Sequence, residues 1–128
     1  MVEDEIRDGR RIAELLASEI DGRKDGELAR IELEVIDEDA EGTPYGEHAY
    51  DVTIDVEVLA GVHVHEDRIH LEFRQGIETA ADAGEERDLR VRPKATDPPR
   101  TLVFVERGAD VKRAVDVIEA VVTTVDEE

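Results

Sequence analysis

The chain has 128 residues, of which 35 are acidic and 16 basic, so its formal net charge is −19. This length is typical of a single domain, 1–128, and the absence of cysteine excludes disulfides and thiolate metal sites. The acidic N-terminus lacks the apolar core of a signal peptide, and no run approaches the ~20 apolar residues of a membrane helix, so we expect a soluble, cytoplasmic protein.

The N-terminal third predicts a helix followed by a strand. Apolar side chains between residues 3 and 20 fall in one stripe, which is typical of a helix packed on a core. Gly22 ends that helix, because glycine tolerates the left-handed conformation common at helix C-termini. Alternating apolar and charged residues over 29–35 then predict a half-buried strand. Residues 37–47 follow as a polar loop with glycine and proline.

The central part carries the clearest strand pattern. From Tyr50, apolar residues alternate with Asp, Thr and Glu, and the same phase continues to Val64. One strand of that length is unusual, so Ala60-Gly61 is interpreted as a turn or a bulge. After Asp67 the phase reverses, and alternate residues of 69–73 become the apolar set. The reversal predicts a hairpin whose tip is Glu66-Asp67.

The C-terminal part predicts a short element, two strands and a final helix. Residues 75–86 fit either an Ala-rich helix or one arm of a hairpin. A short strand at 89–91 precedes the proline-rich connection 93–99, which cannot join the interior of a sheet. The continuous apolar run 102–105 predicts a central strand, and residues 109–124 predict a helix. We therefore expect an α+β fold, with a mainly antiparallel sheet of about five strands and the N- and C-terminal helices packed on one face.

Three of the four histidines lie in the predicted hairpin. A register that pairs its apolar residues also places His63 opposite His70, with Cβ atoms about 5 Å apart. His65 lies two residues further along the same face. Three imidazoles on one face can bind Zn²⁺ and leave its fourth position open. The alternative is that these histidines form only the solvated polar side of a strand. No other cofactor motif is present.

A basic segment, residues 87–113, stands out in this acidic chain. It holds eight basic and four acidic residues. Arg90 and Arg92 alternate with apolar residues and so point the same way, while Lys94 and Arg100 flank the proline-rich connection. These four residues predict a site for an anionic ligand, such as a phosphate or a nucleotide. The alternative is a network of salt bridges to the acidic strands or to an acidic partner subunit. The four aromatic residues of the chain are too few to favour nucleic-acid binding.

The composition also indicates an environment. A folded acidic chain with 3 Lys and 13 Arg is typical of a halophilic protein from a salt-accumulating haloarchaeon. Molar salt shortens the Debye length to ~3 Å, so like charges scarcely repel one another. The stretch LRVRPKATDPPRTLVFVERGADVKRAVDV and the opening helix resemble an uncharacterised family of small haloarchaeal proteins. That resemblance implies no activity and no site residues.

Two functions of different classes follow from these features. The first is a non-enzymatic binding or interaction module that uses the anion-binding segment 87–113. The second is a small metal-binding protein or metal-dependent enzyme that uses His63, His65 and His70. A homodimer joined through an edge strand or the valine-rich last helix is a further expectation. Metal content of the purified protein separates the first two.

Overall fold

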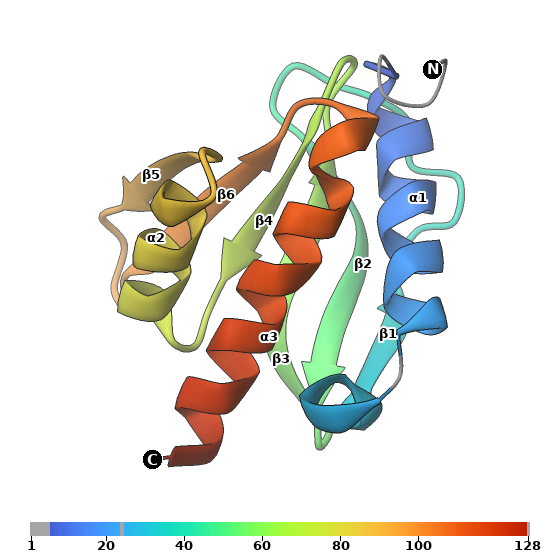
Figure 1. Ribbon diagram of the computed structural model, residues 1–128. Helices are drawn as coiled ribbons and strands as arrows, with labels where there is room; N and C mark the ends of the chain where they lie inside the picture. Colours follow the sequence, from blue (N-terminus) through green and yellow to red (C-terminus); the bar gives the residue numbers. More distant parts are fainter. Residues whose placement is uncertain (1–5, 24, 128) are drawn as a thin grey trace.

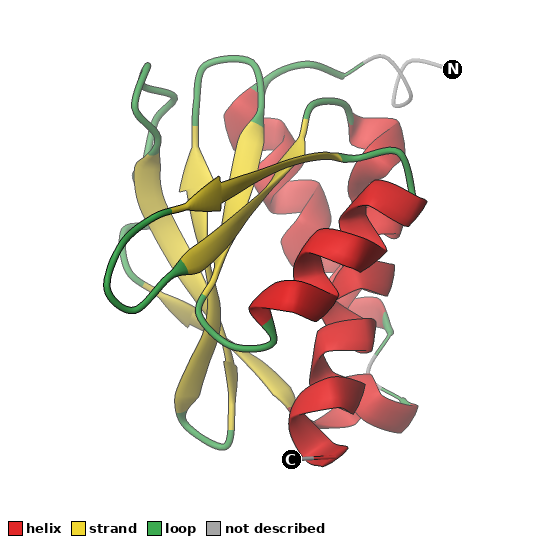
Figure 2. Cartoon of the chain, turned by 90° about the vertical axis from the view of Figure 1, so that its left-hand side faces the viewer, coloured by secondary structure: helices red, strands yellow, loops and turns green. Residues whose placement is uncertain are grey.

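The computed structural model describes residues 6–23 and 25–127, which form an antiparallel sheet covered on one face by helices (Figure 1 and Figure 2). The strands are β1 (Ile31–Val35), β2 (Glu47–Ile54), β3 (Glu57–Val64), β4 (Ile69–Phe73), β5 (Arg90–Lys94) and β6 (Arg100–Val105). The α-helices are α1 (Gly9–Gly22), α2 (Ile77–Glu86) and α3 (Val111–Glu127), with single 3₁₀ turns at η2 (Gly26–Arg30) and η3 (Gly108–Asp110). The six strands lie in the order β1-β2-β3-β4-β6-β5. The predicted α+β class, with both terminal helices on one face, is confirmed.

Helix α1 begins later than the sequence pattern predicts. Asp8 is its N-cap, and the Asp8 carboxylate accepts a hydrogen bond from the backbone N–H of Arg11 at 3.3 Å. Such a cap satisfies a backbone donor that has no partner within the helix, so the helix starts there. Residues 3–5 of the predicted helix lie outside the described residues. The apolar stripe is as expected, with Leu16 at its buried centre.

The long central strand is in fact two strands. The chain does not turn at Ala60-Gly61, but the alternative of a bulge is close, because the register shifts between the pairs Val52–Ala60 and Thr53–Val58. The chain reverses earlier, at Asp55 and Val56, whose φ angles are +50° and +64°. Asp-Val lacks the glycine or asparagine that such a turn favours, which is why the sequence hides it. A register shift beside Val52 and Thr53 then returns β3 to its original phase, so the alternation looks unbroken.

The β3–β4 hairpin has the predicted register. Val64 pairs with Ile69, His63 pairs with His70, and the chain turns between them at Glu66-Asp67. The turn is closed by a hydrogen bond of 2.8 Å from the backbone N–H of His65 to the carbonyl oxygen of Arg68. Matching the apolar residues was sufficient here because a slip of one residue would move every side chain to the other face.

The C-terminal half resolves the open alternative at 75–86, which is helix α2. Pro93 lies in β5, an edge strand, where a missing N–H donor is tolerated. Strand β6 lies between β4 and β5, as expected of a continuous apolar run. Helix α3 follows η3 and extends to Glu127, slightly beyond the predicted end. Within the described residues, no helix combines the length and apolarity needed to cross a membrane.

The two faces of the sheet differ sharply. Helices α1, α2 and α3 lie side by side over one face (Figure 1), and Figure 2 shows the other face free of helices. Beneath the helices, Val62, Leu71 and Val103 are fully buried against residues such as Ile118 of α3. We call the other side the open face. Because side chains alternate along a strand, the polar residues between these core positions all project from the open face.

Candidate metal-binding site on the open face

A row of rings crosses the open face at right angles to the strands. His48 of β2 pairs with His63 of β3, which pairs with His70 of β4, which pairs with Phe104 of β6. The successive ring centroids are 4.7, 4.7 and 5.5 Å apart, and both histidine pairs are stacked. The Arg90 guanidinium ends the row, 4.8 Å from the Phe104 ring centroid. The row follows from strand spacing, since directly paired residues on one face lie about 5 Å apart.

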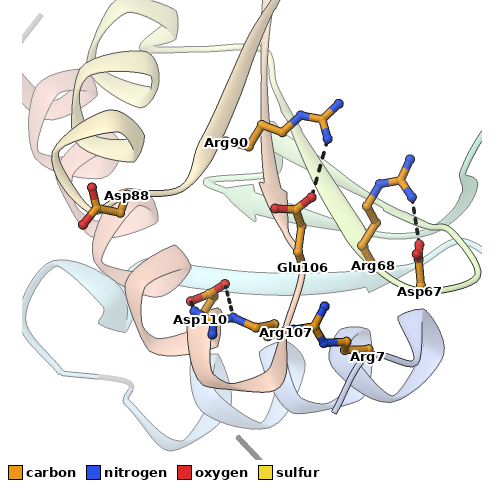
Figure 3. Close-up of a pocket in the computed structure, with 8 residues that line it drawn as sticks. All are labelled: Arg7, Asp67, Arg68, Asp88, Arg90, Glu106, Arg107 and Asp110. Carbon is orange, nitrogen blue, oxygen red and sulfur yellow. Dashed lines mark hydrogen bonds and ion pairs between the residues drawn. The ribbon is translucent and has the colours of Figure 1, made fainter. Parts of the chain in front are cut away.

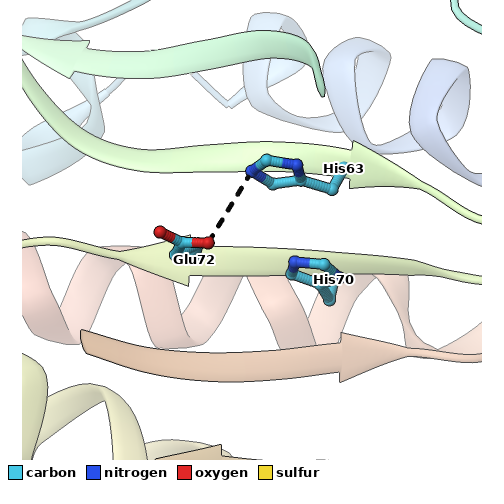
Figure 4. Close-up of side chains that lie close together, drawn as sticks. All are labelled: His63, His70 and Glu72. Atoms are coloured by element: carbon cyan, nitrogen blue, oxygen red, sulfur yellow. Dashed lines mark ion pairs between the residues drawn. The ribbon is translucent and has the colours of Figure 1, made fainter. Parts of the chain in front are cut away.

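His63, His70 and Glu72 form a group that could hold a metal ion (Figure 4). One ligand atom from each residue lies within 4.8 Å of the other two, and Nε2 of His63 is 4.0 Å from Oε1 of Glu72. A tetrahedral zinc ion separates its ligand atoms by roughly 3.3 Å, so binding would draw these side chains together by about 1 Å. Two imidazoles and one carboxylate are a known zinc donor set that leaves a fourth position open.

The predicted ligand His65 takes a different place from His63 and His70. Its ring is next to His70, with Nε2 of His65 2.8 Å from Nδ1 of His70. Its Nδ1 is 3.2 Å from the carbonyl oxygen of Pro44. Both ring nitrogens of His65 are therefore engaged, and Glu72 is the third member of the group. The sequence did not single out Glu72, because carboxylates are everywhere in this chain.

Burial keeps these histidines neutral at physiological pH. It is the largest cause that lowers the pKa of His63 to about 4 and that of His70 to about 3, and neighbouring imidazoles lower both further. Burial, followed by the charge of Arg68, also lowers the pKa of His65. A neutral imidazole offers a lone pair to a metal without first losing a proton.

Glu72 is ionised although it is only 6% exposed. Its burial raises the pKa of the carboxyl group, but hydrogen bonds from Arg100 and Lys94 outweigh that effect and leave the pKa lowered. Nζ of Lys94 lies 3.2 Å from Oε1, while the Arg100 guanidinium binds Oε2. Two cations thus neutralise the carboxylate from the β5–β6 side of the site.

Three polar atoms converge over Gly61 of β3. A Cβ atom there would lie 3.2 Å from both Oδ1 of Asp51 and Nε2 of His48, and 3.3 Å from Nε2 of His63. The first two atoms are themselves 2.6 Å apart, in a hydrogen bond. The missing side chain thus leaves room for polar atoms to converge beside the His63–Glu72 pair. His48 could not be identified as part of the site from the sequence, because its pairing with His63 depends on the turn at Asp55, which the sequence did not predict.

The predicted anion-binding residues are mostly engaged in internal ion pairs. Lys94 and Arg100 hold Glu72, and Arg90 pairs with Glu106 at 3.5 Å. Arg92 is exposed and has no ion pair within residues 6–23 and 25–127. This arrangement corresponds to the intramolecular alternative for three of the four residues.

A cavity of about 600 Å³ opens where β5 and β6 meet the β3–β4 turn (Figure 3). Four arginines and four carboxylates line it: Arg7, Arg68, Arg90, Arg107, Asp67, Asp88, Glu106 and Asp110. Arg68 pairs with Asp67 at 2.8 Å and Arg107 pairs with Asp110 at 3.2 Å. Because the charges balance, this cavity has no net preference for an anion.

Fold and site together define a small α+β protein with a histidine–glutamate cluster on the open face of an antiparallel sheet. The sequence model of a protein family described as "Family of unknown function (DUF7993)" matches residues 1–128, so the chain belongs to that family. This agrees with the expected resemblance to an uncharacterised family. No curated protein and no solved structure matches the chain.

Proposed function

We propose that this protein binds a divalent transition-metal ion through His63, His70 and Glu72. The observation that carries the proposal is the convergence of three donor atoms within 4.8 Å on the adjacent strands β3 and β4. Nitrogen and carboxylate oxygen donors suit Zn²⁺, and imidazole also suits Ni²⁺ and Cu²⁺. The rigid strand pair supports the proposal, because sites on strands hold their ligands more firmly than sites on loops.

The two cations on Glu72 set the strength of such a site. Lys94 occupies Oε1, the carboxylate oxygen that faces His63, so a metal must share this atom or displace the ammonium group. Replacing Lys94 by Gln removes a positive charge next to the ion. K94Q should therefore bind Zn²⁺ more tightly than the wild type. If the ion pair between Lys94 and Glu72 is purely structural, neither the wild type nor K94Q should bind zinc.

Calorimetric titration of the metal-free protein with Zn²⁺ in molar KCl, combined with ¹⁵N NMR of the imidazoles, tests the proposal. We expect one ion per chain and shifts of the His63 and His70 resonances. H70Q should abolish binding. E34Q is the matched control, because Glu34 is an exposed carboxylate of β1 and should not affect it. Unchanged imidazole resonances at stoichiometric zinc would refute the proposal.

A second candidate is a non-enzymatic module that binds an anion through the basic segment 87–113. Arg92 favours it, because this exposed residue has no ion pair among the residues that the structure describes and its guanidinium can reach a ligand directly. Titration with inorganic phosphate and with an acidic peptide should then shift the Arg92 side-chain resonance, and R92Q should lose the response. Unperturbed spectra with both probes would exclude this function.

The charge supports a further proposal, that the protein works in the salt-rich cytoplasm of a halophile. In dilute buffer the net charge of −19 repels itself over a longer Debye length and destabilises the compact state. Circular dichroism across a KCl series should show partial or complete loss of structure at low salt. Full structure in dilute buffer would contradict this.

A further inference from the structure

His65 is held in one orientation by the backbone around it. The 43–46 loop passes over the ring, and Gly46, with φ +87°, approaches so closely that a Cβ there would lie 2.9 Å from Nε2 of His65. A Cβ on Gly42 would lie 2.5 Å from the carbonyl oxygen of His65. His65 as a whole is 6% exposed. Its two nitrogens therefore meet fixed partners, Pro44 on one side and His70 on the other.

The chemistry of these partners decides where the protons lie. The carbonyl oxygen of Pro44 can only accept, so Nδ1 of His65 must carry the hydrogen of that 3.2 Å contact. In a neutral ring the other nitrogen, Nε2, then has only a lone pair. It accepts a hydrogen bond from Nδ1–H of His70 over 2.8 Å. Nδ1 of His70 is thus protonated, and Nε2 of His70 is left with a free lone pair.

Ring geometry directs that lone pair away from His65. Nδ1 and Nε2 point in divergent directions from an imidazole, so a ring that turns Nδ1 toward His65 turns Nε2 elsewhere. His65 lies at the turn end of the β3–β4 hairpin. Glu72 lies on β4, on the other side of His70 from that turn. Nε2 of His70 therefore faces the part of the site where Glu72 lies.

We infer that His65 is a positioning residue, which fixes His70 in the Nδ1–H tautomer and so presents Nε2 to a metal ion. The inference rests on the proposed metal site for its purpose, but the tautomer itself exists without metal. It extends the chain of contacts one residue beyond the ligands, from His70 through His65 to the backbone of Pro44. Outer contacts of this kind typically change metal affinity 10- to 100-fold.

The tautomer of each histidine can be measured directly by long-range ¹H–¹⁵N NMR of the metal-free protein in molar KCl at alkaline pH. Wild type should show His70 protonated at Nδ1. H65F removes the acceptor, so His70 should shift toward the Nε2–H tautomer. H65Q should restore the wild-type tautomer, because an amide oxygen can accept from His70 while its NH₂ donates to Pro44. E34Q is the control, since Glu34 is an exposed carboxylate of β1 outside the row of rings.

Zinc titrations of the same variants connect the tautomer to the site. H65F should bind about 10- to 100-fold more weakly than wild type, and H65Q should recover most of that loss. A wild-type His70 protonated at Nε2 overturns the inference, and so does an H65F variant with an unchanged His70 tautomer. The expected tautomers together with no zinc binding would uphold the role of His65 and reject only the proposed function.

Discussion

The two faces of the sheet are built from the same strands but are stabilised by different forces. On the helix-covered face, Val62 and Leu71 are buried by contact with other apolar side chains. On the open face, His70 and Glu72 are almost as buried, although no helix covers them. They are enclosed by stacked rings and ion pairs. Hydrophobic burial is non-directional and tolerates substitution by residues of similar size, whereas hydrogen bonds and ion pairs depend on particular atoms.

The largest expected effect lies on the helix-covered face. Phe73 is fully buried, and its replacement by alanine leaves a cavity in the core. F73A should lower the free energy of unfolding by about 3–5 kcal/mol. Chemical denaturation in molar KCl measures this. Y45A is the control, because Tyr45 is 92% exposed and should change stability by less than about 0.5 kcal/mol. A similar loss in both variants would contradict the difference between buried and exposed positions.

Acid should act mainly on the open face. The folded-state pKa values of His63 and His70, about 4 and 3, lie below the ordinary value of 6.5, so the unfolded chain binds more protons between these limits. The stability that the two neutral histidines contribute is therefore fully present above pH 6.5, and it falls as the pH drops toward 4. The loss should be on the order of 3 kcal/mol, after allowance for the partial exposure of His63. Thermal unfolding as a function of pH measures it.

The matched variant for the acid experiment is H63Q. Glutamine does not titrate, so H63Q should lose less stability than wild type between neutral pH and pH 4. A pH profile identical to that of wild type would show that His63 is not held neutral by the fold.

A smaller effect is expected at Gly61, where the open face lacks a side chain. G61A places a methyl group within 3.3 Å of His48, Asp51 and His63, and these side chains must move apart. Zinc affinity should fall by about tenfold, which corresponds to 1.4 kcal/mol. Stability should change little, because flexible side chains can shift. Calorimetry and denaturation of one sample separate the two effects, and unchanged affinity would mean that the polar atoms over Gly61 take no part in binding.

The smallest expected change in stability lies in the turn between β2 and β3, outside both faces of the sheet. Val56 has φ +64° and is 94% exposed, so it is strained and buries almost nothing. V56G removes the clash between Cβ and the backbone, and should raise the free energy of unfolding by about 1 kcal/mol without changing zinc affinity. Denaturant midpoints at fixed salt would show the gain, and a lower midpoint would contradict the strain.

The sequence predicted the helix-covered face better than the open one. Apolar alternation was enough to place Ile69 opposite Val64 and, with it, His63 opposite His70. Apolar burial leaves a periodic signal in the chain. The open face depends on pairings that leave no such signal. Glu72 is one of 35 acidic residues, and His48 reaches His63 only through a turn with atypical residues.

The role of His65 could not be predicted from the sequence either. It depends on the carbonyl oxygen of Pro44, which belongs to a long loop and not to a neighbouring strand. A side chain's position on a strand can be read from periodicity, but the partner of a ring nitrogen cannot. The predicted set of three histidines therefore shares His63 and His70 with the group of possible ligands but does not include Glu72.

The strand order has a kinetic consequence. Strands β2, β3 and β4 are joined by short turns and can pair early, whereas β4 meets β6 only after residues 74–99 have closed as a loop. Local pairings form faster, because less chain entropy is lost before the first contact. Amide protection during refolding should thus appear between β3 and β4 before it appears between β4 and β6. The histidines would assemble first, and Glu72 would receive Lys94 and Arg100 in a later step.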